Sequence, residues 1–270
     1  MPTSTINGVL LHWQRTGESG NPLVLVHGSW TDHHTGDLVV PALSRSFRVL
    51  TYDRRGHSQS ERPVGQGSVR EDVADLAALI EHLEFAPAHV VGGSFGGSIV
   101  LRLAGERPDL FRSVVVHEPP LFQLLDQEPG AEAALSAIHE RTDAALHLLN
   151  VGDASSGARQ FVETIALGPG AWKRLPSALR NIFIFNALTF SDEMQDPDTL
   201  NLDLSTLRDF KGPALLTLGA HSPAFFALVV RKLVHALPKA ETKTFAEAGH
   251  VPYVSHPQEV AEAVKRFARQ

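Results

Sequence analysis

Short apolar runs rich in β-branched residues alternate with segments of helical apolar spacing along the first part of the chain. The runs are typical of buried strands, and the helical segments are typical of helices that cover a sheet. Strands are expected over 9–14, at a sheet edge, and over 23–26, 47–52, 89–91 and 114–116. Helices are expected over 38–43, after Ser68, and after the glycine-rich segment 92–96. Ser68 followed three positions later by Glu71 predicts a capping box at the second of these helices.

This alternation stops at Pro119-Pro120 and resumes after Gly212-Pro213. The segment between them predicts helices over 131–149, 158–166 and 171–188. Beyond it, strands are expected over 213–218 and 242–246, and helices over 225–237 and 257–268. A mostly parallel sheet with helices on both faces accounts for the two outer segments. We therefore expect an α/β core built from residues 1–118 and 206–270, with residues 119–205 inserted as a helical cap.

The composition narrows the classes of function. The chain has 270 residues, no cysteine and a formal net charge of −6. Without cysteine, disulfides, thiol catalysis and thiolate metal sites are excluded. The acidic balance and the lack of a basic stripe argue against a nucleic-acid partner. Because neither a secretory signal nor a membrane-spanning stretch is readable, we expect a cytoplasmic protein without a membrane partner. The sequence leaves open whether the chain forms a homodimer.

A Gly-x-Ser-x-Gly motif at residues 92–96 is the most informative local pattern. A β-branched run precedes it and helical spacing follows it, as a strand–turn–helix arrangement requires. A serine in such a sharp turn is held in a strained backbone with its hydroxyl projecting into open space. Ligands of open parallel sheets bind beyond the carboxyl ends of the strands, and Asp53, Ser94 and Glu118 all fall at such ends.

Taken together, four segments resemble the α/β-hydrolase superfamily over nearly the whole chain. They are His27-Gly28-Ser29-Trp30, Asp53 to Ser60, Gly92 to Gly96 and Ala248-Gly249-His250. The resemblance implies an α/β-hydrolase fold: an eight-stranded, mostly parallel sheet with helices on both faces and an inserted helical cap. The second segment is similar to the family's Asp-x-Arg-Gly-x-Gly-x-Ser loop, with Ser58 where the second glycine usually stands. It implies a structural role for Asp53 and Arg55.

The resemblance also implies roles for matched positions. Ser94 would attack a carbonyl carbon, and His250 would take its proton and later deliver it to the leaving group. The oxyanion would be bound by the backbone N–H groups of Phe95 and Ser29, with Trp30 as the alternative second donor.

The acid of the triad departs from the family pattern. Its usual aspartate lies on the loop after the seventh strand, where this chain has Ser222. Glu118 is the best substitute, because it ends the strand that follows the nucleophile helix. The segment His117-Glu118-Pro119 is similar to the corresponding stretch of zearalenone-type lactone hydrolases, in which a glutamate after this strand is the triad acid. Glu247 and Asp203 are weaker candidates, and a broken triad is the remaining alternative.

The substrate pocket is expected to be largely apolar. The residues predicted to line it are Trp30, His33, Phe122, Trp172, Phe183, Phe185 and Val251. The run Asp32-His33-His34 suggests a metal, but adjacent histidines rarely share one ion, so no metal is expected.

These observations favour a cofactor-free serine hydrolase that cleaves a small hydrophobic carboxylic ester or lactone through an acyl-enzyme on Ser94. A carbon–carbon bond hydrolase would use the same residues. A non-catalytic protein that binds a ligand under the cap is the alternative from another class, motivated by Ser222.

Overall fold

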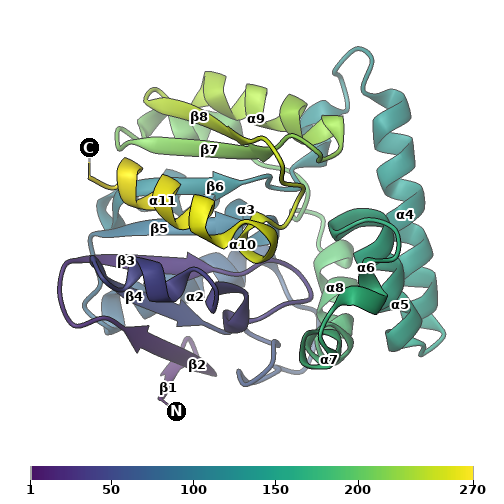
Figure 1. Cartoon of the computed structure of the whole chain (residues 1–270), viewed down its shortest axis with the longest axis horizontal. Helices are drawn as coiled ribbons and strands as arrows, with labels where there is room; N and C mark the ends of the chain where they lie inside the picture. Colours follow the sequence, from purple (N-terminus) through teal and green to yellow (C-terminus); the bar gives the residue numbers. More distant parts are fainter. Residues whose placement is uncertain (1, 270) are drawn as a thin grey trace.

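Within residues 2–269, which the computed structural model describes, eight strands form one sheet in the order β1-β2-β4-β3-β5-β6-β7-β8 (Figure 1). β1 and β2 pair antiparallel, as do β2 and β4, whereas the remaining pairs are parallel. The strands are β1 (Thr3–Ile6), β2 (Val9–Thr16), β3 (Asn21–Val26), β4 (Phe47–Tyr52), β5 (Ala88–Gly93), β6 (Phe111–His117), β7 (Ala214–Gly219) and β8 (Ala240–Phe245).

The prediction that residues 9–14 form an edge strand was wrong, because β1 pairs along the outer side of β2. The two strands are joined by Asn7 and Gly8, which both have positive φ, at 47° and 80°. Two positive φ values in a two-residue loop match the twist of a tight hairpin, and Asn-Gly is the dipeptide that adopts them most readily. The Asn-Gly pair was therefore the signal that the hydrophobic pattern alone did not contain.

Helices cover both faces of the sheet. Apolar residues of α2 (Val69–His82), α3 (Phe95–Glu106) and α9 (Ala224–Ala236) belong to one core cluster. Those of α1 (Val40–Leu43) and α11 (Pro257–Phe267) belong to a second. Figure 1 shows α11 crossing in front of the strands. The predicted capping box is present at the start of α2, where the Ser68 N–H donates to Glu71 and Arg70 N–H donates to Ser68.

Between β6 and β7 the chain is helical and lies beyond the carboxyl ends of the central strands (Figure 1). The main helices of this insertion are α4 (Glu132–Asn150), α5 (Ala154–Phe161), α6 (Ala171–Arg174), α7 (Ser177–Phe185) and α8 (Ala187–Gln195). A π-helical turn over Val162–Ala166 extends α5. The single helix expected over 171–188 is divided into three. Pro176 cannot donate a backbone hydrogen bond, and Leu175 before it is extended, with ψ of 138°.

Four short 3-10 turns and one further helix complete the elements. They are η1 (His33–Gly36), η2 (Pro108–Leu110), η3 (Phe122–Leu125), η5 (Leu204–Asp209) and α10 (Pro252–Ser255). Among residues 2–269, no helix combines the length and the apolar character that crossing a bilayer requires.

Candidate active site

Ser94 occupies the turn between β5 and α3 with φ of 52° and ψ of −126°. This backbone is strained for a residue with a side chain, and the surrounding glycines make it sterically feasible. A Cβ added at Gly92 would lie 2.5 Å from the carbonyl oxygen of Gly96, and one at Gly96 would lie 2.3 Å from that of Val26. The Ser94 N–H donates to the carbonyl oxygen of His117 at 2.8 Å, which ties the turn to β6.

The structure brings Ser94, His250 and Glu118 together, with the His250 ring between the other two side chains and in contact with both. His250 lies in the loop after β8, and its Nε2 is 3.0 Å from the Ser94 hydroxyl. Its Nδ1 is 2.7 Å from Oε2 of Glu118. The other carboxylate oxygen, Oε1, accepts the backbone N–H of Gly219 at 2.7 Å. The imidazole is stacked on the ring of Phe226, with centroids 4.6 Å apart and an interplanar angle of 12°. Both polar ends of the imidazole are therefore engaged and its plane is held.

Electrostatics keep the Glu118 carboxyl group ionised. Its complete burial would raise its pKa, but the hydrogen bond with His250, the neighbouring histidines and the Gly219 N–H hold the pKa below its usual range. His117 also lies near this carboxylate, with Nε2 3.5 Å from Oε2. Burial lowers the pKa of His117 to about 4, so His117 is neutral at neutral pH. The negative charge of Glu118 is thus available to His250.

Within the described residues, His250 makes no side-chain hydrogen bond with Ser222 or with the two weaker acid candidates. The Ser222 hydroxyl is buried and makes no hydrogen bond within the described part of the chain. Asp203 accepts the N–H of Ser205 at 2.9 Å and so caps η5. Glu247 is exposed to solvent. Of the carboxylates considered from the sequence, Glu118 is the one that contacts His250.

The predicted oxyanion donors belong to segments that lie beside Ser94. Phe95 is the first residue of α3, so its N–H has no acceptor within the helix. A Cβ added at Gly28 would lie 3.2 Å from the Ser94 Cβ and 3.8 Å from the Phe95 nitrogen. Glycine at position 28 therefore lets the Ser29 loop approach the start of α3 closely. Trp30, the alternative donor, has a φ of 65°.

A cavity of about 860 Å³ opens above Ser94 and His250, between the strand ends and the helical insertion. Four residues expected near the substrate line it, namely Ser29, His33, Phe183 and Val251. The sequence analysis did not single out Leu175, Leu179 and Ile182, which also line it. Leu179 and Ile182 are three positions apart on one face of α7, a spacing that could have revealed them, whereas Leu175 precedes this helix with an extended backbone.

The four other predicted pocket residues lie outside this lining, which corrects those predictions. Trp30 is fully buried and stacks with Phe161 of the insertion, with centroids 5.0 Å apart. Phe122 packs edge-on against Phe225 in the main core. Trp172 packs against the core of the insertion. Phe185 is on the outer side of α7, where it is 64% exposed. Apolar character alone did not distinguish core, pocket and surface positions.

The profile of the alpha/beta hydrolase fold family matches residues 21–257. The chain belongs to this family. The predicted superfamily and eight-stranded fold are thereby confirmed.

Relatives of this α/β hydrolase differ in activity. It is 28% identical to the dihydrolipoyllysine-residue acetyltransferase component of the acetoin cleaving system of Pseudomonas putida, over 98% of this chain and 68% of that protein. It is 23% identical to the pimeloyl-acyl-carrier protein methyl ester esterase of Yersinia pseudotuberculosis, over 96% and 98%. The crystal structure of the enol-lactonase from Burkholderia xenovorans superposes with a TM-score of 0.72, at 23% identity over 100% of both chains. At this level of identity, the similarity to the enol-lactonase structure shows a shared fold.

A second histidine–carboxylate pair lies beside the cavity of this α/β hydrolase, and its histidine, His33, contributes to the lining. His33 Nδ1 lies 2.6 Å from Oδ1 of Asp53, which also accepts the His33 N–H at 2.9 Å. Asp53 Oδ2 accepts the N–H of Gln59 at 3.0 Å. Nitrogen and oxygen atoms of His12, His33 and Asp53 lie within 4.8 Å of one another, as do those of Asp32, His33 and His34. His33 and Asp53 bind each other, whereas Nε2 of the buried His12 has no hydrogen-bond partner among the described residues. The expectation of no metal stays a prediction.

Proposed function

We propose that this α/β hydrolase is a cofactor-free serine hydrolase that cleaves a carboxylic ester or lactone. The continuous contact from Ser94 through His250 to the buried Glu118 supports this proposal most directly. A hydroxyl becomes a competent nucleophile when an adjacent imidazole can accept its proton, and the imidazole needs a partner that fixes its tautomer.

Each side chain has a role in the proposed reaction. Ser94 Oγ attacks the substrate carbonyl carbon while its proton passes to His250 Nε2. His250 Nδ1–H remains hydrogen-bonded to Glu118, which stabilises the imidazolium. The N–H groups of Phe95 and Ser29 bind the oxyanion, each contributing about 3 kcal/mol to lowering the barrier. His250 then protonates the leaving alkoxide. A water gives a proton to His250 and attacks the acyl carbon, and the Ser94 oxygen leaves the acyl group and takes that proton back from His250.

The cavity supports a hydrophobic substrate. Leu175, Leu179, Ile182 and Phe183 contribute apolar side chains to it beside the nucleophile. The activities named for two relatives, an acetyltransferase component and a methyl ester esterase, both concern acyl groups. We further propose that residues 119–205 act as a cap that shields the acyl-enzyme from solvent, on a core formed by residues 1–118 and 206–270.

The direct test is labelling with a serine-directed fluorophosphonate, with wild type compared with Ser94→Ala. We expect stoichiometric modification of Ser94 in the wild type and none in the variant, which should keep its fold and its ligand affinity. Absence of labelling over hours in the wild type would favour a non-catalytic binding protein. A panel of p-nitrophenyl esters and lactones then separates the two substrate classes, and turnover of carbon–carbon substrates alone would contradict the proposed reaction.

A further inference from the structure

Glu193 of α8 reaches out of the helical insertion into a buried charge cluster of the core. Its Oε1 accepts a hydrogen bond from Nη2 of Arg54, whose side chain is completely buried. The same Nη2 lies 2.9 Å from Nε2 of His57, and Nη1 lies 3.4 Å from Oδ2 of Asp72. Glu193 is itself only 7% exposed. This cluster is one of the polar contacts between the insertion and the core; another is the hydrogen bond from Asn186 Nδ2 to the Thr31 carbonyl oxygen, at 3.1 Å.

The cluster contacts both segments that carry the proposed oxyanion donors. The guanidinium carbon of Arg54 lies 4.5 Å from the centroid of the Phe95 ring. The Ser29 side chain lowers the pKa of the Glu193 carboxyl group, so the Ser29 loop lies close to it. The backbone N–H of Arg54 also donates to Nε2 of His27, just before the Ser29 loop, at 2.9 Å. One carboxyl group of the insertion is therefore connected through Arg54 to the start of α3, by the Phe95 ring, and to the Ser29 loop, by His27 just before it.

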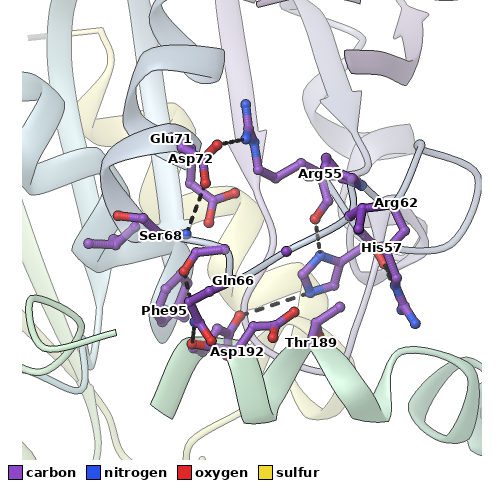
Figure 2. A pocket seen from close by; sticks show the side chains of 17 residues that line it. Arg55, His57, Arg62, Gln66, Ser68, Glu71, Asp72, Phe95, Thr189 and Asp192 are labelled. Atoms are coloured by element: carbon purple, nitrogen blue, oxygen red, sulfur yellow. Dashed lines mark hydrogen bonds and ion pairs between the residues drawn. The ribbon is translucent and has the colours of Figure 1, made fainter. Parts of the chain in front are cut away.

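A small second cavity of about 90 Å³ borders this cluster. Figure 2 shows His57, Asp72, Phe95 and Asp192 around it. Asp192 precedes Glu193 on α8 and lines the same cavity, but no side chain of the described residues hydrogen-bonds to its carboxyl group. Asp192 is therefore a matched control for substitution of Glu193, because it is an acidic residue on the same helix.

We propose that Glu193 is a positioning residue for the oxyanion hole. By binding Arg54, which contacts both the Phe95 ring and His27, it holds α8 against the two segments whose N–H groups would bind the oxyanion, so that the packing of the insertion sets the geometry of the hole. This inference rests on the proposed function. Donors of an oxyanion hole act on the transition state more than on the bound substrate, so their misplacement lowers kcat more than it raises KM.

The test compares Glu193→Gln with Asp192→Asn in ester hydrolysis and in binding of phenylboronic acid, which forms a tetrahedral adduct on an active serine. We expect Glu193→Gln to lower kcat by about tenfold or more with KM nearly unchanged. It should weaken boronate binding by a similar factor, while affinity for the alcohol product stays constant. Asp192→Asn should match the wild type. Unchanged kcat and boronate affinity in Glu193→Gln would overturn the inference, and so would an equal loss of product and boronate affinity.

Arg54→Lys supplies an independent test, because it keeps the positive charge but removes the guanidinium group that contacts Glu193 and Phe95. If the two residues act together, the double variant should lose clearly less than the product of the two single losses in kcat. Fully multiplicative losses would contradict the coupling, even if Glu193→Gln alone proves unstable. Labelling with fluorophosphonate distinguishes failure of the proposed function from failure of this inference. If wild-type protein does not react with fluorophosphonate, the proposed function and the inference both fall. If it reacts and Glu193→Gln reacts equally fast, only the inference falls.

Discussion

Glu118, at the end of β6, and His250, in the loop after β8, lie 2.7 Å apart between Oε2 and Nδ1, although 132 positions separate them in the chain. β6 and β7 are parallel neighbours, so their carboxyl ends reach the same rim of the sheet. From that rim the Glu118 carboxylate bridges the Gly219 N–H at the end of β7 and the imidazole. The carboxylate that the loop after β7 lacks at Ser222 is thus supplied by the adjacent strand.

Replacement of this carboxylate tests the relationship. Glu118→Gln retains the shape of the side chain but removes the charge that holds Nδ1 protonated and stabilises the imidazolium. We expect kcat to fall by roughly 10³–10⁴-fold, as for a neutralised triad acid, while the fold is kept. Steady-state kinetics on a p-nitrophenyl ester, with circular dichroism as the control, measures this. A loss smaller than about tenfold would assign the acid role to another group.

Gly219 tests how closely the two loops must approach. A Cβ at this position would lie 2.5 Å from the Gly249 carbonyl oxygen and 2.6 Å from that of Ala248, so Gly219→Ala must displace the His250 loop. We expect a decrease in kcat of about tenfold or more, together with a lower Tm, because small misplacements of reacting groups are costly. Gly249→Ala is the matched control, since a Cβ there meets nothing within 4 Å. Equal activity of both variants would show that loop spacing does not matter.

Ile182 tests the apolar wall of the cavity. Ile182→Ala enlarges the space beside Ser94, so kcat/KM should shift toward esters with longer acyl or alcohol chains. Each additional buried CH₂ contributes about 0.8 kcal/mol, or roughly a fourfold change. Phe185→Ala is the control on the same helix, because Phe185 is exposed and lies outside the cavity lining. The measurement is kcat/KM over a series of p-nitrophenyl esters, and an identical shift in both variants would contradict the assigned lining.

The buried cluster around Arg54 predicts a pH dependence of stability. Burial raises the pKa of Glu193 from 4.5 to about 7, against the opposing effects of Arg54 and Ser29, and Asp72 raises it further. Between these two values the folded state binds a proton that the unfolded chain has lost. The contribution of Glu193 to the free energy of unfolding therefore falls as pH rises from about 4.5 to 7, by up to about 1.4 kcal/mol per pH unit.

Comparison with Glu193→Gln isolates this contribution. Asp72, whose pKa burial raises to about 6, is present in both proteins, and so is His57, whose pKa burial holds well below its usual value. Urea unfolding at several pH values should show the stability of the wild type, relative to the variant, declining across this window. A difference that is constant with pH, or that grows as pH rises, would contradict the raised pKa.

Much of the fold could be predicted locally. Continuous β-branched runs, the capping box of Ser68 and Glu71, and prolines at segment boundaries act over a few residues, and the central strands and α2 follow from them. The turn at Ser94 is equally local, because its glycines are required by contacts with the next helix and the neighbouring strand. The hydrophobic pattern does not predict β1, which is indicated instead by the Asn7-Gly8 turn.

The tertiary structure decided which distant groups meet. The order of the strands brings Glu118, rather than Ser222, to His250, and the packing of α8 on the core brings Glu193 to Arg54. Helical spacing places Phe183 and Phe185 two positions apart on one helix, but only the packing of α7 turns the first to the cavity and the second to solvent. Local sequence determines backbone conformation and burial preference, because those depend on neighbouring residues. The contacts of the site depend on how whole elements pack, and a single sequence pattern does not encode that packing explicitly.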